Sequence, residues 1–184
     1  MDTTNLQIIR ESFSRVAWTH KTHEKSAEIE EGKVKKVKWI NIILSALTFV
    51  LFSAGVIFSE QQIVLYLAVL MSAITLGYNF FLLSFNPEKL AESHRYIAKE
   101  LWFIREKYVN LIADIINEKI SGDKITQKRD QFIHELKVLY KFAPPTTTEA
   151  YNKASSALKN NEELTFSDEE INNFLPKELH INQK

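Results

Sequence analysis

Three histidines are the side chains best suited to metal binding or proton transfer. His20 and His23 are three residues apart, so a helix would place both on one face, and His94 lies far along the chain. Neither a third histidine nor a carboxylate pair accompanies them, and packing or polar contacts therefore explain the two histidines better than a metal site. A lone polar residue in an apolar seam, such as His94, more often fixes helix register than binds a ligand. We predict no metal site and no catalytic histidine.

The sequence lacks the other usual catalytic patterns. Its four glycines stand far apart, which excludes a glycine-rich phosphate loop, and no Gly-flanked serine or HExxH motif occurs. With no cysteine, the chain has neither disulfides nor Cys-ligated metals. The 23 basic and 23 acidic residues balance, which argues against nucleic-acid binding through bulk charge. We therefore expect no enzyme activity, no cofactor and no direct nucleic-acid binding.

A stripe of small polar residues inside two apolar runs is the stronger candidate site. Side chains of this kind let helices approach closely and hydrogen bond to each other. In several copies, the same side chains could instead line a water-filled pore, because two spans cannot enclose a channel alone. Both readings apply to Asn41, Ser45, Thr48, Ser72, Thr75 and Asn79.

The two runs that carry these residues have the length of membrane spans. Residues 39–59 and 63–85 contain no charged side chain, and helices of that length cross a hydrocarbon core of about 30 Å. The linker allows only a hairpin. Its turn carries Glu60, whereas seven basic residues flank the outer ends: Lys33, Lys35, Lys36, Lys38, Lys89, Arg95 and Lys99. The positive-inside rule then places both termini in the cytoplasm, and a multi-pass protein of the inner membrane is expected.

The flanking segments predict helices. Residues 5–38 form an amphipathic helix, in which the charge run 20–31 is expected to be a solvated face and Gly32 to mark a bend. Asn86 and Pro87 predict the start of another helix. This second helix has a coiled-coil-like seam with steps of three and four, formed by Leu90, His94, Ile97, Leu101, Ile104, Tyr108, Leu111 and Ile115. The seam packs either on the N-terminal helix or on the same helix of neighbouring subunits.

Shorter helices are predicted after the seam. One covers about 126–142, a second follows a capping box at Thr146, and a third follows Ser167. The predicted regions are an N-terminal helix (1–38), a transmembrane hairpin (39–85), a helical region (86–160) and a short C-terminal helix and tail (161–184). The sequence thus predicts an all-α membrane protein, a two-helix transmembrane hairpin with a cytoplasmic helical bundle.

The order of several short motifs resembles a known family. The motifs are VAWTHKTH at 16–23, a basic approach to a two-span hairpin, Tyr108 and Leu111 on the following helix, APPT at 143–146, and Tyr151 with Ala154. Over about residues 10–160 the chain resembles the SLATT family, the SMODS and SLOG-associating two-transmembrane effectors. The resemblance implies a prokaryotic conflict-system protein, encoded beside a nucleotide-signalling or reverse-transcriptase partner.

The resemblance also implies a function. Such a protein would be an anti-phage effector that oligomerises and forms a pore or disrupts the inner membrane when a partner or nucleotide signal arrives. The uncharged spans, the long seam and the lack of catalytic patterns agree with this. The alternative is a non-conducting membrane scaffold whose cytoplasmic helices recruit a partner. In both cases the bilayer is a partner, and the pore requires a homo-oligomer.

Overall fold

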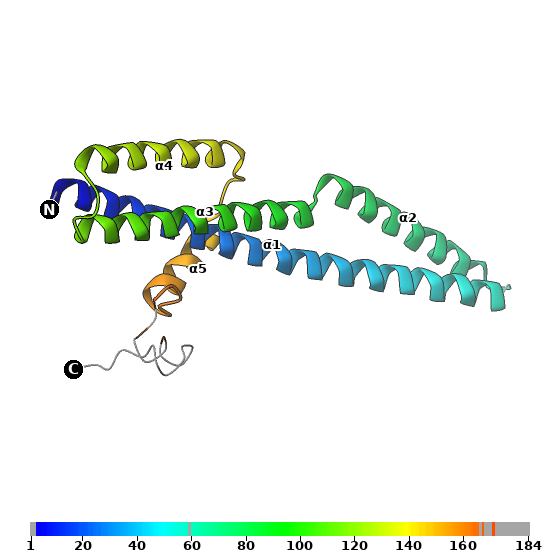
Figure 1. The fold of residues 1–184 in the computed structure, drawn as a ribbon. Helices are drawn as coiled ribbons and strands as arrows, with labels where there is room; N and C mark the ends of the chain where they lie inside the picture. Colours follow the sequence, from blue (N-terminus) through cyan, green and yellow to red (C-terminus); the bar gives the residue numbers. More distant parts are fainter. Residues whose placement is uncertain (1–2, 59, 166, 168–170, 172–184) are drawn as a thin grey trace. The chain divides into compact units, whose positions relative to one another are not determined.

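Five helices make up the described part of the chain. The computed structural model describes residues 3–58, 60–165, 167 and 171, and within them no strand occurs. The helices, drawn in Figure 1, are α1 (Thr3–Ile57), α2 (Gln62–Ser84), α3 (Pro87–Ile116), α4 (Gly122–Phe142) and α5 (Thr148–Lys159). The prediction of an all-α fold is confirmed. The short helix predicted after Ser167 lies outside the described residues, apart from Ser167 and Ile171 themselves.

Contacts divide the chain into two compact units. The bundle unit comprises residues 1–25 and 97–184, and the hairpin unit comprises residues 26–96. Helices α1 and α3 each contribute residues to both units.

The bundle unit has one apolar core, which the seam of α3 organises. Leu101 and Tyr108 of α3 are 0% and 1% exposed and belong to the same cluster as Ile9 and Val16 of α1. Helix α4 adds Phe132, whose ring lies 5.0 Å from that of Tyr108 in an edge-to-face arrangement. The 3.5-residue spacing of the seam therefore keeps one face of α3 inside the bundle over several turns.

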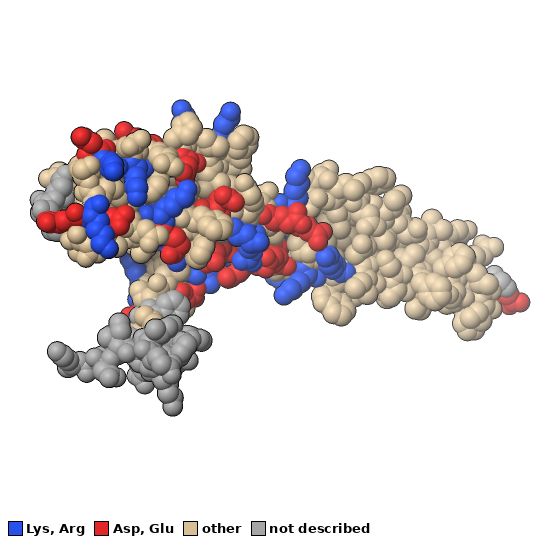
Figure 2. Space-filling model, viewed as in Figure 1, with Lys and Arg blue, Asp and Glu red and all other residues tan. Residues whose placement is uncertain are grey.

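The two spans of the hairpin unit are apolar on their outside. The most apolar windows of the two long helices have mean hydropathies of 2.3 and 1.8, yet only 6% of each window is buried. Core helices of soluble proteins are mostly buried, whereas here Phe49 and Leu83 are 71% and 78% exposed. Figure 2 shows this surface free of charged side chains between its two ends. Two helices of this kind fit a two-transmembrane domain.

Helix α1 differs from the prediction in its charge run. It passes through Gly32 without a break, so the bend predicted there does not interrupt the helix. The solvated face predicted for residues 20–31 is wrong, because four consecutive side chains are only 3–6% exposed: His20, Lys21, Thr22 and His23. Successive residues of a helix turn by about 100°, so four of them cover its whole circumference. This part of α1 is enclosed on every side, which an amphipathic pattern does not predict.

Helices α3 and α5 begin with side-chain caps. Asn86 accepts a hydrogen bond from the Lys89 backbone N–H through Oδ1 at 3.0 Å, and Pro87 occupies the first turn of α3, as predicted. The cap of α5 is Thr147 and not the predicted Thr146. The Thr147 hydroxyl accepts from the Ala150 backbone N–H at 3.2 Å. Helix α5 buries a face made only of alanines: Ala150, Ala154 and Ala157.

Candidate functional site

Two polar pairs join the helices of the hairpin. Asn41 of α1 donates from Nδ2 to Oδ1 of Asn79 on α2 at 3.1 Å. The hydroxyl oxygens of Thr48 and Thr75 lie 3.3 Å apart and share a hydrogen bond. Each threonine hydroxyl also lies 2.8 Å from a backbone oxygen four residues earlier in its own helix. Four of the six predicted stripe residues therefore meet across the hairpin.

The stripe also faces a groove that opens on one side of the hairpin. The groove has a volume of about 680 Å³, and its lining includes five of the six predicted residues: Ser45, Thr48, Ser72, Thr75 and Asn79. Phe52, Leu65 and Val69 supply much of the remaining wall. No acid, base or histidine lines the groove. Its hydroxyl and amide groups can therefore hydrogen bond to water or coordinate an ion, but none of its side chains can take up and release a proton.

Toward the turn, the two helices approach closely at a small residue. A Cβ added to Gly55 of α1 would lie 2.8 Å from Leu65 Cδ2 of α2. Gly55 is buried, and Ala68, the next small residue of α2, is only 4% exposed. Small residues at such crossings allow the contact between backbones that holds membrane helices together. The hairpin is thus closed by packing at this end and joined by polar pairs elsewhere.

The predicted seam lies inside the chain. Leu90 is half-buried, and the other seven seam residues are at most 5% exposed: His94, Ile97, Leu101, Ile104, Tyr108, Leu111 and Ile115. From Ile97 onward, these residues pack in the bundle core with side chains of α1 and α4. Of the two partners considered from the sequence, the N-terminal helix of the same chain is the one seen here.

A buried polar cluster on α1 escaped the sequence reasoning. The Lys21 side chain is 8% exposed, and its Nζ lies 2.6 Å from Glu24 and 2.9 Å from Glu163. Lys25 reaches the same Glu163 carboxylate at 3.4 Å. The hydrogen bonds and ion pairs of Lys21 outweigh its burial and raise its pKa. The sequence offered one signal, which is the mixture of basic and acidic residues at 20–31 without an apolar stripe. The partner that buries Lys21, Glu163, lies some 140 residues further along the chain.

Two aromatic contacts bring α5 to the same stretch of α1. The rings of Trp18 and Tyr151 lie 5.5 Å apart, and Lys159 Nζ lies 5.5 Å from the Trp18 ring centroid. Both Tyr151 and Lys159 belong to α5. The part of α1 that carries the VAWTHKTH motif therefore holds α5 through aromatic and charged contacts.

His20 lies within the polar cluster of α1. Burial lowers the pKa of His20 and outweighs the neighbouring Glu24 carboxylate, which lies 3.7 Å from Nε2. Its Nδ1 is buried without a hydrogen-bond partner among the described residues. Within that part of the chain, no group of three metal-ligating side chains gathers around the histidines.

Comparisons with known proteins identify one family. The profile described as SMODS and SLOG-associating 2TM effector domain family 4 matches residues 6–170. The match begins at Leu6 within α1 and includes the other four helices in full, so it covers both helices of the hairpin. No curated protein and no solved structure matches the chain.

Proposed function

Because the chain belongs to the SMODS and SLOG-associating two-transmembrane effector family and is a membrane effector domain, we propose that it acts by permeabilising the membrane. In this proposal several copies assemble, and the polar stripe of the hairpin turns from its partner helix toward water. The stripe would then line a path through the hydrocarbon core. The observation that carries the proposal is the line of hydroxyl and amide groups along an otherwise apolar hairpin.

The polar pairs are weak enough to part. Interhelical hydrogen bonds in membranes contribute about 0.6 kcal/mol on average, so separating both pairs costs on the order of 1 kcal/mol. Water in an open path would hydrogen bond to the released groups. A signal of modest strength could therefore shift the hairpin between a closed and a water-filled arrangement.

The path requires more than one copy. Two helices cannot surround a column of water, and the groove beside the stripe is open on one side. Copies anchored in one bilayer share one orientation, so a ring about the membrane normal is the symmetry that closes a pore. This makes homo-oligomerisation part of the proposal.

Charge placement supports an orientation with both termini in the cytoplasm. Four lysines precede the first span, Lys89 follows the second, and the turn carries Glu60. The proposed location is the inner membrane of a prokaryotic cell. A partner encoded beside the effector, of the nucleotide-signalling or reverse-transcriptase kind, would then deliver its anti-phage signal to the bundle unit.

Dye release from vesicles tests the proposal. The full chain is reconstituted with its activating partner, and the release of a trapped dye is followed. Replacing Thr48 and Thr75 with valine keeps their volume and removes both hydroxyls, and release should fall. Leucine at Val50 and Val56, two lipid-facing positions of α1 that do not line the groove, should leave release unchanged. Vesicles that stay intact with the activated, correctly inserted wild type would rule out permeabilisation.

A non-conducting scaffold is the second candidate. The hydrogen bonds between the stripes within one chain favour it, because they pair four of the six stripe residues without any pore. In that case, valine at Thr48 and Thr75 would leave effector toxicity intact, and substitutions on the surface of the bundle would remove it. The two functions therefore respond to different variants.

A further inference from the structure

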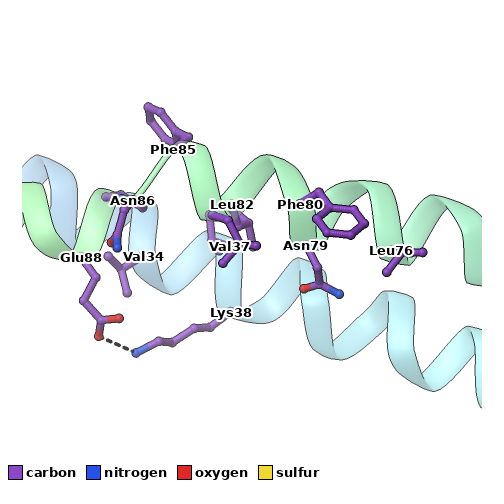
Figure 3. A pocket seen from close by; sticks show the side chains of 12 residues that line it. Val34, Val37, Lys38, Leu76, Asn79, Phe80, Leu82, Phe85, Asn86 and Glu88 are labelled. Carbon is purple, nitrogen blue, oxygen red and sulfur yellow. Dashed lines mark hydrogen bonds and ion pairs between the residues drawn. The ribbon is translucent and has the colours of Figure 1, made fainter.

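A second groove lies where α2 ends and α3 begins, within the hairpin unit. It has a volume of about 370 Å³ and is formed by residues of α1, the last turns of α2 and the first turn of α3. Figure 3 shows Lys38 of α1 and Glu88 of α3 directed toward each other, with Leu82 and Val37 between the helices. The groove exists because the chain leaves its helix at Phe85 and restarts at Pro87, while α1 continues beside it.

The walls of this groove divide into an apolar part and a polar part. Leu76, Phe80 and Leu83 of α2 belong to the uncharged span, and the last two are 61% and 78% exposed. The polar part consists mainly of Lys38 and Glu88 at the end of the span. This division matches an amphiphile, which has a charged head and a hydrocarbon chain.

The ion pair at the polar end can be replaced. Lys38 Nζ and Glu88 Oε1 are 3.3 Å apart, and their side chains are 64% and 62% exposed. Ion pairs as exposed as this one contribute little to stability. A phosphate oxygen could therefore take the place of the Glu88 carboxylate at small cost and keep the lysine paired.

The surrounding charge favours an anion. Lys35 and Lys89 are exposed and form no ion pair within the described part of the chain. The N-terminus of the 30-residue helix α3 adds the positive end of its dipole. Basic pockets beside spans are recognised sites for anionic lipid headgroups.

We propose that this groove binds one anionic phospholipid from the surrounding bilayer. Its phosphate lies at Lys38, and an acyl chain lies along Phe80 and Leu83. A lipid is favoured over a soluble anion because the apolar wall is part of a span and Trp39, 65% exposed, stands next to Lys38, as tryptophans do at membrane surfaces. The bound lipid would join α1 to the start of α3, whether or not the hairpin conducts.

Native mass spectrometry of the full chain in a neutral detergent tests the site. The probes are phosphatidylglycerol and phosphatidylcholine with the same acyl chains. The wild type should retain phosphatidylglycerol preferentially. Lys38→Gln should weaken that binding about fivefold, the effect of one lysine near an anionic headgroup. The matched control, Lys36→Gln, removes a charge that does not line the groove, and it should change binding by less than about twofold.

Two further variants examine the competing carboxylate and the apolar wall. Glu88→Gln should strengthen phosphatidylglycerol binding, because Lys38 loses its internal partner, whereas Glu92→Gln, on an exposed position one turn further along α3, should not. Val34→Phe fills the groove without a change of charge and should weaken binding. Val50→Phe, on the lipid-facing side of α1, is its control.

Three results would overturn the proposal. Equal retention of phosphatidylcholine would show that the headgroup charge does not matter. Equal losses with Lys36→Gln and Lys38→Gln would reduce the effect to general surface charge. Displacement of the lipid by glycerol phosphate at similar concentration would show that the site takes a free anion and that the apolar wall contributes nothing.

Discussion

Asn41 and Asn79 are 38 residues apart in sequence and share a hydrogen bond of 3.1 Å inside the apolar hairpin. This bond gives each amide one partner that a bilayer does not offer, while Asn41 Oδ1 stays buried without a partner among the described residues. The pair thus sets how the two spans face each other at the end where both basic clusters lie. It also gives the hairpin a measurable interaction between its helices.

A double-mutant cycle measures this interaction. Asn41→Leu, Asn79→Leu and the double variant should give a coupling of about 0.6 kcal/mol, and at most about 1.7 kcal/mol, because the alternative partners of an amide in a membrane are few but not absent. Reversible unfolding in mixed micelles provides the free energies. Additive single-variant effects would mean that the two amides do not meet in the membrane.

Gly55 should tolerate a side chain less well than Gly77. A Cβ at Gly55 would lie 2.8 Å from Leu65 Cδ2, whereas nothing lies within 4 Å of a Cβ at Gly77. We expect Gly55→Val to weaken the hairpin by about 1–3 kcal/mol, as overpacking does, and Gly77→Val to have a much smaller effect. Adding Leu65→Ala should restore part of the loss. The same micelle assay is suitable, and equal effects at the two glycines would contradict the close approach.

The stability of the helices outside the spans should fall in mild acid. Burial lowers the pKa values of His20 and His94 below the ordinary value of 6.5, although Glu24 and Glu30 respectively act in the opposite direction. Nearby cations also lower these pKa values: Lys21 and Arg105 for His20, and Lys33 for His94. The unfolded chain therefore takes up protons near pH 6.5, while the folded chain takes them up only at lower pH. The stability that the folded chain gains from keeping His20 and His94 uncharged is therefore complete above pH 6.5 and is lost as the pH falls.

Thermal unfolding between about pH 7.5 and about pH 5.5 shows this effect. The melting temperature should drop over that interval, and it should drop less for the variant with glutamine at both His20 and His94. His134→Gln, at an exposed position, serves as the control. The lowered pKa values of Glu135 and Glu163 affect stability only below their ordinary value of 4.5, outside this interval. A decline that persists in the double variant would assign the acid sensitivity to other groups.

The seam should act within one chain. Leu101 is 0% exposed in the bundle core, so Leu101→Ala should cost about 2–5 kcal/mol by leaving a cavity. Val109→Ala, on the same helix but 43% exposed, should cost far less. The melting temperature of each variant, measured at low and high protein concentration, checks the result. A Leu101→Ala effect that grows on dilution would indicate that the seam joins separate copies.

The sequence predicted the elements of this protein better than their surroundings. The length of the two uncharged runs predicted the spans, and apolar residues at steps of three and four predicted the seam. Asn86 and Pro87 predicted the start of α3. These signals are local, because they depend on periodicity and backbone chemistry within a few turns. The polar stripe was predicted in the same way, and its residues do lie together in the hairpin.

Long-range polar contacts could not be predicted in this way. Residues 20–31 have the composition of a solvated helix face, but Lys21 is buried because Glu163 and Glu24 both pair with it. Nothing near residue 163 marks it as the partner of a lysine on α1. Gly32 does not interrupt α1, since the flanking helix residues outweigh the modest cost of one glycine, about 1 kcal/mol relative to alanine.

The alanine face of α5 makes this helix the first candidate for local opening. Ala150, Ala154 and Ala157 bury about one methyl group each, and burying three such groups contributes only about 2.4 kcal/mol. The other helices of the bundle unit bury leucine, isoleucine and phenylalanine side chains. Amide protons of α5 should therefore exchange with solvent sooner than those of α3 or α4, through a partial unfolding that leaves the remaining core intact. The VAWTHKTH stretch of α1, which contacts α5 through Trp18, would be uncovered in that state.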